Sequence, residues 1–598
     1  MVLRKPGKTV EQQQTAGAYR PVSLLSALGK VIETAIGQRI AEAAESQQLL
    51  PETQMGNRPH RSTELAVRMV VDIAHTAWSQ GAVASLLQLD IQGAYDCVNH
   101  TRLLHTMQRQ GFPMWTIRWI ASYLTDRTAR LHFDGQTTEP RKLATGSPQG
   151  SPLSPILWLL YTASLFEELK AIGGLVTIGF SDDLNLLAVG KTTLITRSHL
   201  EAAWPICQRW AHARGLKFAP GKSELMHLTR HHAAETTPVR LGDLVIQPTQ
   251  EARFLGIWLD RKLKWKGHLA AIKRKFATQQ FALTRLTASV WGCDLLRARE
   301  VYTKVIRSAI AYGAGVWHQL ADQPKGIAVK IAPYQSKCLR VVSGAYKATP
   351  VRLLESEVAI PPIDIYLNRR VADFEARLER SGMATLLQLV CSEVATKLRA
   401  RRHRKCSASP APSTSLEYGK GRAKWASEWA GDQRASKRLF KQWQARWQHQ
   451  DSAAEQQAGH RRYPRAPAAL PELLAKPLKK HIGLSKHESS LLVQIRIGKV
   501  GLRAFLFERK VPDIASPHCR CGLAAEMPAH VVIACPELSV QREVLRSQLN
   551  PFSLQTSQDF ANATLDHRKA IKVVRWLLGS GRFREFRLAE HYRAEGVG

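Results

Sequence analysis

Apolar and polar positions along the first 260 residues follow two different periods. Apolar residues at helical spacing predict helices within 19–44 and 64–78, over 101–125, directly after Pro155 and over about 192–214. Shorter apolar runs of strand length, VASLLQL, LVTIGF and LNLLAVG, predict buried strands, and LGDLVIQP and ARFLGIWLD predict a further pair. From Trp265 to about residue 390 the pattern is helical throughout. A region of mixed strands and helices is therefore followed by a helical one.

The runs LVTIGF and LNLLAVG flank a short polar break, Ser181-Asp182-Asp183, and this arrangement predicts a β-hairpin. Turn chemistry favours Asn-Gly or Asp-Gly at such a break, whereas two adjacent carboxylates stand here. The pair is either a solvated turn, because Asp tolerates awkward backbone angles, or part of a functional site.

Another carboxylate, Asp90, ends the strand VASLLQL and is followed by a turn or helix that begins through Gly93. Asp90 is either a helix N-cap or a partner of the Asp182-Asp183 pair. Asp96 has the same ambiguity, and we interpret it as a cap.

Two loops in this region suit a nucleotide ligand. The stretch ATGSPQGSPLSP is rich in glycine and proline, and at Gln149-Gly150 the backbone can approach a ligand closely. The stretch QMGNRPHRST, residues 54–63, holds Arg58, His60 and Arg61, and a basic loop of this kind can hold phosphate. A plain helix entry and an ordinary solvated loop are the respective alternatives.

Composition narrows the class of partner. The 598 residues include 85 Lys plus Arg against 49 Asp plus Glu, which gives a formal charge of +36. A field of that sign favours a polyanion, and for a chain of this size nucleic acid is a better match than lipid. The longest apolar stretch is too short to span a bilayer, and the N-terminus lacks the apolar segment of a secretion signal. Six of the nine cysteines are scattered singly, so we expect a reducing, intracellular location, nuclear or cytoplasmic.

The C-terminal third contains three further signals. The basic run over 397–405 leads into SASPAPSTS, which has the composition of a linker and marks a domain boundary. Beyond the linker, four tryptophans alternate with cations at helical spacing, and we favour core packing over base stacking for them. The last signal is C-x-C-G-x7-H-x4-C, whose three thiols and one imidazole have the composition of a structural zinc site. Three reduced cysteines and a surface histidine are the alternative. The residues concerned are Trp425, Trp429, Trp443 and Trp447, and Cys519, Cys521, His530 and Cys535.

Taken together, the acidic residues suggest a single shared function. Asp90 and the Asp182-Asp183 pair lie about ninety residues apart, with the glycine-rich loop between them. Two-metal phosphoryl transfer needs several hard oxygen ligands that converge from different strands on two Mg2+ ions. The basic surface then supplies the grip on a template.

At this point the sequence resembles the reverse transcriptases of non-LTR (LINE-like) retrotransposons, over about residues 4–260. YRPVSLLSALGKVIE and QMGNRPHRST resemble the two fingers blocks, LDIQGAYDCVNH motif A, GSPQGSPLSPIL motif B, FSDD motif C, LKFAPGKSE motif D and ARFLGIWLD the primer grip. The resemblance implies an α+β right-hand polymerase fold. Its domains would be fingers and palm over 1–260, a helical thumb or connection over 261–395, a basic and Ser/Pro linker over 396–420, and a C-terminal helical region over 421–598. The last of these would end in a small Cys/His knuckle at 519–535.

The same resemblance implies roles for matching residues. Asp90, Asp182 and Asp183 would bind two Mg2+ ions, with the Ile91 carbonyl as an additional ligand, and Tyr95 would exclude a ribose 2′-hydroxyl. Gln149 and Gly150 would line the site of the incoming nucleotide and template. Lys222 would be a general acid toward pyrophosphate and Arg61 a triphosphate contact. Cys519, Cys521, His530 and Cys535 would bind Zn2+ and help to hold RNA.

Three positions depart from the family pattern. Ser181 stands where Ala is more usual, Asn57 where an aromatic residue is usual, and His60 where Gly is common. The chain starts just before the fingers, so we expect a shortened form without an endonuclease domain. We also find no acidic constellation that resembles ribonuclease H.

The leading hypothesis is an RNA-directed DNA polymerase that extends a DNA primer on an RNA template with dNTPs. The alternative is an inactive, retroelement-derived nucleic-acid-binding protein. An intron-encoded maturase is a third possibility, against which the C-terminal Cys/His motif speaks.

Overall fold

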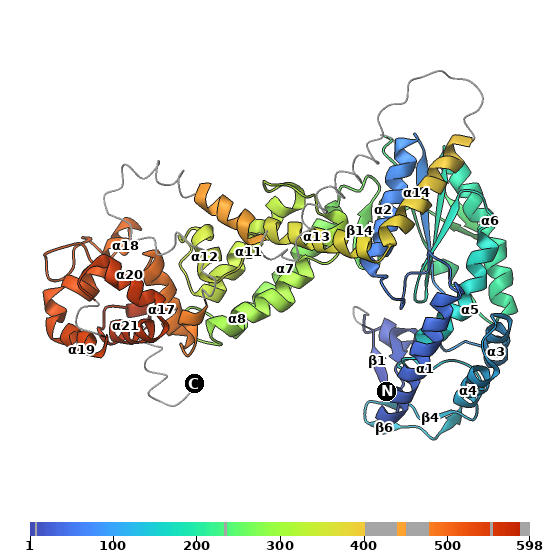
Figure 1. Cartoon of the computed structure of the whole chain (residues 1–598), viewed down its shortest axis with the longest axis horizontal. Helices are drawn as coiled ribbons and strands as arrows, with labels where there is room; N and C mark the ends of the chain where they lie inside the picture. The colour runs from blue at the N-terminus through green and yellow to red at the C-terminus, as the bar shows by residue number, and fades with distance from the viewer. Residues whose placement is uncertain (6–8, 232–235, 401–438, 450–477, 550–553, 587–598) are drawn as a thin grey trace, which may run out of the picture. The chain divides into compact units, whose positions relative to one another are not determined.

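The computed structural model describes residues 1–5, 9–231, 236–400, 439–449, 478–549 and 554–586 (Figure 1). The chain divides into two compact units. Unit 1 comprises residues 1–268 and 375–424, and unit 2 comprises residues 269–374 and 425–598.

Unit 1 is built on a four-stranded antiparallel sheet with the strand order β10-β3-β9-β8. The central strands are β3 (Val83–Leu89) and β9 (Asp183–Gly190), and the edge strands are β8 (Leu175–Phe180) and β10 (Glu224–Leu228). Nearly every residue of β3 and β9 is buried, because helices cover both faces of the sheet. This explains why both strands have continuous apolar runs rather than an alternating pattern.

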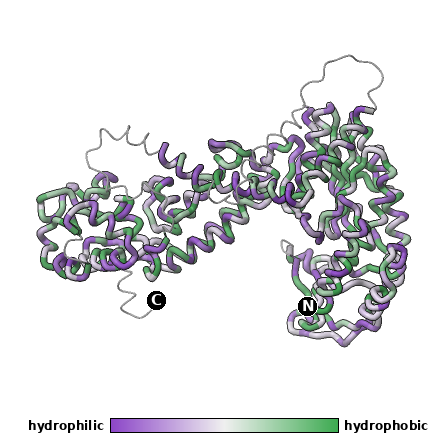
Figure 2. Tube along the Cα trace, in the orientation of Figure 1, coloured by the Kyte–Doolittle hydropathy of each residue, from purple (hydrophilic) through white to green (hydrophobic). Residues whose placement is uncertain are grey.

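In Figure 1 the helices α2 (Thr63–Ser79) and α14 (Met383–Ala400) lie on one side of this sheet, and α5 (Ser154–Leu169) and α6 (Thr193–Ala213) lie on the other. Ser62 begins α2 by accepting a hydrogen bond from the Leu65 N–H. The trace in Figure 2 is predominantly hydrophobic where the strands run between these helices. The core of unit 1 therefore sits in the sheet and on the inward faces of the helices.

Smaller elements surround the sheet of unit 1. Asp134 and Gly135 form a tight turn, in which both residues have positive φ and connect two short paired strands. The two apolar runs after residue 240 form separate two-stranded ribbons. These elements are α1 (Ala27–Ser46), α3 (His100–Arg109), α4 (Met114–Leu124), β1 (Val2–Arg4), β2 (Tyr19–Pro21), β4 (Thr128–Ala129), β5 (His132–Phe133), β6 (Gln136–Thr137), β7 (Arg141–Lys142), β11 (Val239–Leu241), β12 (Leu244–Ile246), β13 (Glu251–Phe254) and β14 (Ile257–Asp260).

Unit 2 is helical in the residues that the structure describes. Its C-terminal part packs α17, α20 and α21 around one hydrophobic core. The helix α17 begins with a capping box formed by Ser485 and Glu488. The helices are α7 (Lys266–Leu286), α8 (Leu295–Val301), α9 (Arg307–Ile310), α10 (Ala314–Trp317), α11 (Gly326–Ser343), α12 (Val351–Glu357), α13 (Ile363–Arg380), α17 (Lys486–Ile497), α18 (Arg503–Glu508), α19 (Ser539–Leu549), α20 (Ser557–Leu565) and α21 (His567–Gly579). The first residues of α7 and the last residues of α13 are counted in unit 1.

The compact units divide the chain differently from the predicted helical domain over 261–395. Helix α14 packs on α2 and belongs to unit 1, while α8 to α12 and nearly all of α7 belong to unit 2. The reason is that the apolar stripe of α14 covers α2 beside the sheet, which sequence separation alone does not reveal. Most of the predicted linker over 396–420 lies outside the described residues.

The prediction of core packing is confirmed for Trp443 and Trp447, both of which are buried. Trp425 and Trp429 lie outside the described residues. Among the helices that the structure describes, none has the length and apolarity needed to cross a membrane.

Candidate active site

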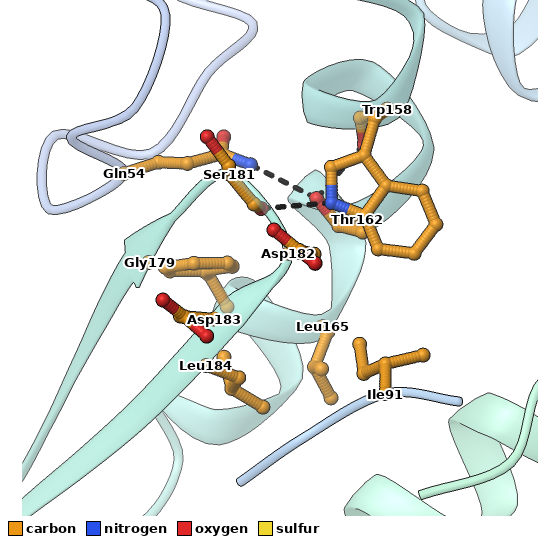
Figure 3. Close-up of a pocket in the computed structure, with 11 residues that line it drawn as sticks. Gln54, Ile91, Trp158, Thr162, Leu165, Gly179, Ser181, Asp182, Asp183 and Leu184 are labelled. Atoms are coloured by element: carbon orange, nitrogen blue, oxygen red, sulfur yellow. Dashed lines mark hydrogen bonds between the residues drawn. The ribbon is translucent and has the colours of Figure 1, made fainter. Parts of the chain in front are cut away.

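The predicted hairpin is present as β8 and β9, and its turn is shorter than the polar break suggested. Phe180 pairs with Asp183, so that only Ser181 and Asp182 form the turn. Asp182 stands at the tip, and Asp183 is the first residue of β9 (Figure 3). Ser181 has a φ of 56°, which is the left-handed region that Gly normally occupies.

Asp90 reaches the same end of the sheet from the neighbouring strand. The β3–β9 ladder ends at the pair Leu89–Leu184, and Asp90 is the residue that directly follows β3. Adjacent residues on antiparallel strands lie only about 5 Å apart, so Asp90 and Asp183 sit side by side at the sheet end. The chain then turns, without a helix, and Asp90 is not an N-cap.

The three carboxylates influence one another electrostatically. Desolvation, followed by the negative charges of Asp182 and Asp90, raises the pKa of Asp183 to about 6. The Lys222 Nζ lies 2.8 Å from Asp90 Oδ2, and both side chains are partly exposed. A cluster of hard oxygen donors with surplus negative charge fits divalent cations of the Mg2+ class. The residues present are therefore suited to the predicted metal site.

Ile91 and Tyr95 lie on the chain that follows Asp90. Ile91 is buried, forms an isolated bridge with Phe218 and lines the recess beside the hairpin. Tyr95 is half-buried, and its ring centroid lies 5.6 Å from that of Trp158. Desolvation and the charge of Asp182 raise the pKa of Tyr95 to about 12, so this phenol stays protonated. Tyr95 therefore lies close enough to Asp182 for the charge of this carboxylate to affect the pKa of the phenol.

The capping interpretation of Asp96 is wrong for the helix that follows. Helix α3 begins at His100, and Asn99 accepts the hydrogen bond from the Arg102 N–H. Both Asp and Asn are good N-cap residues, and the turn through Gly93 continues far enough that Asn99 occupies the position.

Gln149 and Gly150 lie in the rigid loop that enters α5. Gly150 has a φ of 125°, and a Cβ on it would lie 2.7 Å from the Ser23 carbonyl oxygen. The Ser23 N–H donates to the Gln149 carbonyl oxygen at 2.7 Å. The loop thus needs glycine at 150 because the Ser23 backbone lies against it, and the approach of a ligand at Gln149-Gly150 stays a prediction.

The basic loop over 54–63 is tied to neighbouring acids. The Arg58 guanidinium pairs with Glu45 at 2.7 Å through two nitrogens and is buried. The Arg61 side chain is only 5 % exposed and pairs with Glu52. These contacts do not support a triphosphate role for Arg61, which stays a prediction. His60 has a φ of 62°, the conformation that explains why Gly suits this position.

The same loop packs directly against the hairpin. The Met55 N–H donates to the Gly179 carbonyl oxygen at 2.7 Å, and the Gly179 N–H donates to the Thr53 carbonyl oxygen at 3.1 Å. The Gln54 amide donates to Thr162 Oγ1 at 2.9 Å. Loop 53–57 therefore supports β8, the strand that leads into the Ser181-Asp182 turn.

Sequence reasoning missed Gln54 and Trp158. Both line the recess beside the hairpin, and the Trp158 Nε1–H donates to the Ser181 carbonyl oxygen at 2.8 Å (Figure 3). Trp158 stands in an apolar helix where it is indistinguishable from core. The signal that could have singled it out is its indole N–H, because a buried donor requires a partner.

The C-terminal Cys/His residues converge in space. The ligand atoms of Cys519, Cys521, His530 and Cys535 lie within 4.8 Å of one another. The Cys519 and Cys535 sulfurs are 3.7 Å apart, and Cys521 Sγ lies 3.3 Å from His530 Nε2. A tetrahedral zinc site with Zn–S bonds of about 2.3 Å places its sulfurs about 3.8 Å apart, so the set fits zinc.

The predicted Cys/His cluster shares the hydrophobic core of the C-terminal helices. Cys519 and Cys535 are buried in the same hydrophobic core as α17 and α21. Val531 and Val532, which lie between two of the ligands, are fully buried in that core. The ligands are therefore part of a larger helical domain.

Part of the chain is similar to known proteins. Residues 3–259 match the reverse transcriptase (RNA-dependent DNA polymerase) family. The chain is 28% identical over 384 residues to the RNA-directed DNA polymerase from mobile element jockey of Drosophila melanogaster. This alignment covers 63% of this chain and 41% of that protein. The chain is 27% identical over 400 residues to the probable RNA-directed DNA polymerase from transposon BS of the same species, with coverage of 64% and 42%. The chain thus matches less than half the length of these relatives. Apo telomerase from Candida tropicalis aligns with 12% identity and a TM-score of 0.30, over 62% of this chain and 60% of that one.

Proposed function

Because residues 3–259 form a reverse transcriptase domain similar to those of non-LTR retrotransposons, we propose that the chain is an RNA-directed DNA polymerase. It would extend a DNA primer on an RNA template with dNTPs. The observation that carries the proposal is the meeting of three carboxylates at one end of the sheet, where the charges of Asp90 and Asp182 help to raise the pKa of Asp183.

In this proposal Asp90, Asp182 and Asp183 hold two Mg2+ ions, together with the Ile91 carbonyl. When bound, the ions supply the positive charge that favours ionisation of the attacking primer 3′-hydroxyl and balances the leaving pyrophosphate. Three carboxylates on two strands and a tight turn keep their oxygens in place before the substrate arrives.

The remaining side chains bind and select the nucleotide. The Tyr95 ring would exclude a ribose 2′-hydroxyl, which is supported by its proximity to Asp182 and its packing on Trp158. The loop at Gln149 and Gly150 would line the nucleotide and template site. Lys222 would donate a proton to pyrophosphate, and its ion pair with Asp90 keeps its ammonium group at the rim of the site.

We further propose that Cys519, Cys521, His530 and Cys535 hold one Zn2+ ion. When bound, zinc cross-links segments of the C-terminal core that are held otherwise by apolar contacts. The high positive charge supports RNA as a partner of the whole chain. The cysteines that the structure describes all have free thiols, which supports an intracellular location.

Primer extension tests the polymerase proposal. We expect the full chain to incorporate dNTPs on a primed RNA template with Mg2+, and Asp182→Asn to lose more than about 100-fold of that rate because a metal ligand is removed. Asp243→Asn is the matched control, since Asp243 is an exposed carboxylate in the turn between β11 and β12. An Asp182→Asn variant as active as wild type would refute the assignment. RNA binding that weakens with salt, without incorporation under any divalent metal, would instead favour the inactive nucleic-acid-binding alternative.

A further inference from the structure

The turn that presents Asp182 has an unfavourable backbone conformation. In a two-residue hairpin turn of this kind, a positive φ at the first position is the place for Gly. Ser181 holds that position with a φ of 56°. A residue with a Cβ in this region costs about 1–2 kcal/mol relative to the right-handed region. The conformation must therefore be imposed by contacts from outside the hairpin.

Contacts from two separate elements meet at Ser181. From α5, the Trp158 Nε1–H donates to the Ser181 carbonyl oxygen at 2.8 Å. From loop 53–57, the Asn57 amide donates to Ser181 Oγ at 2.9 Å. Gly56 allows this loop to approach, because a Cβ there would lie 2.3 Å from the Ser181 nitrogen. The backbone carbonyl and the side chain of one strained residue are thus each held by a separate donor.

Trp158 also contacts the nucleotide side of the site. Its side chain is 1 % exposed, and its ring lies against Tyr95 with 5.6 Å between centroids and 42° between planes. One rigid indole therefore touches both the turn that carries Asp182 and the ring proposed to exclude ribose.

We propose that Trp158 and Asn57 are positioning residues that hold Ser181 in its left-handed conformation and so fix the direction of Asp182. The indole N–H performs the positioning, while the Trp158 ring supports Tyr95. This inference rests on the proposed polymerase function for its kinetic consequences, and on the turn geometry alone for its structural ones.

Trp158→Phe separates the two tasks of Trp158, because it removes the N–H and retains an aromatic ring. We expect the rate of single-nucleotide incorporation to fall about 5- to 10-fold, as for the loss of one hydrogen bond. The KM for dNTP and the preference for dNTP over rNTP should change less than about 2-fold. Adding Ser181→Gly should restore most of the rate, because glycine adopts positive φ without strain.

Trp210→Phe is a matched control. Trp210 is equally buried at 1 % exposure, and its Nε1–H donates to Ser164 Oγ at 3.0 Å, away from the turn. It should retain the wild-type rate within about 2-fold. Asn57→Ala should slow incorporation in the wild-type background and have no further effect in a Ser181→Ala background, since both remove the same contact.

Hydrogen exchange in the full chain provides a readout that does not depend on activity. We expect Trp158→Phe and Asn57→Ala, but not Trp210→Phe, to speed exchange of the amides in 179–184. The proposal is overturned if exchange there is unchanged and, where the wild type polymerises, Trp158→Phe keeps its rate within about 2-fold. A wild-type chain without incorporation refutes the polymerase assignment, and the exchange result still decides the positioning role.

Discussion

Two buried glutamates on α12 are predicted to have opposite charge states. Glu357 is 2 % exposed and pairs with Lys480 at 2.7 Å and with Arg496 at 3.0 Å. Although burial alone would raise its pKa, these two cations lower the pKa of Glu357 to about 2. Glu355, two residues earlier, receives a hydrogen bond from the Gln335 amide at 3.0 Å, and burial raises the pKa of Glu355 to about 8. The same substitution at these two sites should therefore act in opposite directions.

Glu357→Gln should destabilise unit 2 at pH 7. A drop in pKa from the ordinary 4.5 to about 2 corresponds to about 3 kcal/mol of preference for the ionised form. Removing the charge also leaves Lys480 and Arg496 buried without their anion, for which costs of about 3–5 kcal/mol are typical. Because the folded pKa is depressed, this stabilisation is present above pH 4.5 and is lost as the pH falls toward 2.

Glu355→Gln should stabilise unit 2 at neutral pH. The carboxyl is neutral in the folded chain and ionised in the unfolded chain between pH 4.5 and 8, so the wild type loses stability as the pH rises through that window. Glutamine is neutral in both states and still accepts from Gln335. The gain at pH 7 is about 3 kcal/mol at most, and it should shrink by about 1–2 kcal/mol at pH 6.

Hydrogen exchange of α11, α12 and α17, converted to opening free energies at pH 6, 7 and 8, measures both effects within unit 2. The expected result is a loss of stability for Glu357→Gln at every pH and a gain for Glu355→Gln that increases with pH. Equal effects of the two substitutions, or a gain for Glu355→Gln that is independent of pH, would refute the assigned charge states.

Two further predictions concern the proposed sites. The purified chain should contain about one zinc per molecule, and chelation should speed hydrogen exchange in α17, α20 and α21, whose core includes Cys519 and Cys535. The Cys519→Ser variant should lose the zinc, whereas the control variant Cys293→Ser should retain it. A metal-free chain whose hydrogen exchange is unchanged would contradict the zinc proposal. Gly150→Ala should slow nucleotide incorporation at least about 10-fold, because the alanine Cβ at a φ of 125° would lie 2.7 Å from the Ser23 carbonyl oxygen. Gly173→Ala is the control, since an added Cβ there would have no atom within 4 Å. Equal incorporation rates for the two variants would exclude a role for the geometry of the loop at Gly150.

The sequence was most informative where the spacing of apolar residues and the type of residue predicted the same secondary structure. The runs LVTIGF and LNLLAVG predicted the hairpin, and strand length placed Asp90 at the end of β3. The sequence could not show that Asp183 belongs to the strand, since turn and strand residues meet there without a Gly or Pro. It also could not show that α14 joins unit 1, because packing between distant segments depends on complementary surfaces rather than on local pattern.

The carboxylates of the site could be predicted from the sequence, whereas the residues that hold the turn and its strand in place could not. Asp stands out against apolar strands, whereas Trp158 in an apolar helix and Gln54 in a polar loop each match their surroundings. For Arg61 the sequence shows a basic loop but not the ion pair with Glu52 that the structure places there, and its triphosphate role stays a prediction. A functional role can therefore be inferred for a charged residue only when the oppositely charged residue nearest to it in the structure is known.

The two departures at Asn57 and Ser181 are better understood as one change. Considered separately, a polar residue in place of an aromatic at 57 suggests altered packing, whereas a hydroxyl in place of a methyl at 181 is a small change that fits. In the structure they contact each other, and the Asn57 amide donates to Ser181 Oγ at 2.9 Å. With Ala at 181 the amide would lose this partner, and with an aromatic at 57 the hydroxyl would lose its donor. Since removing one partner of a hydrogen bond costs more than replacing both, the pair indicates a turn whose packing is intact, as the polymerase chemistry proposed for Asp182 requires.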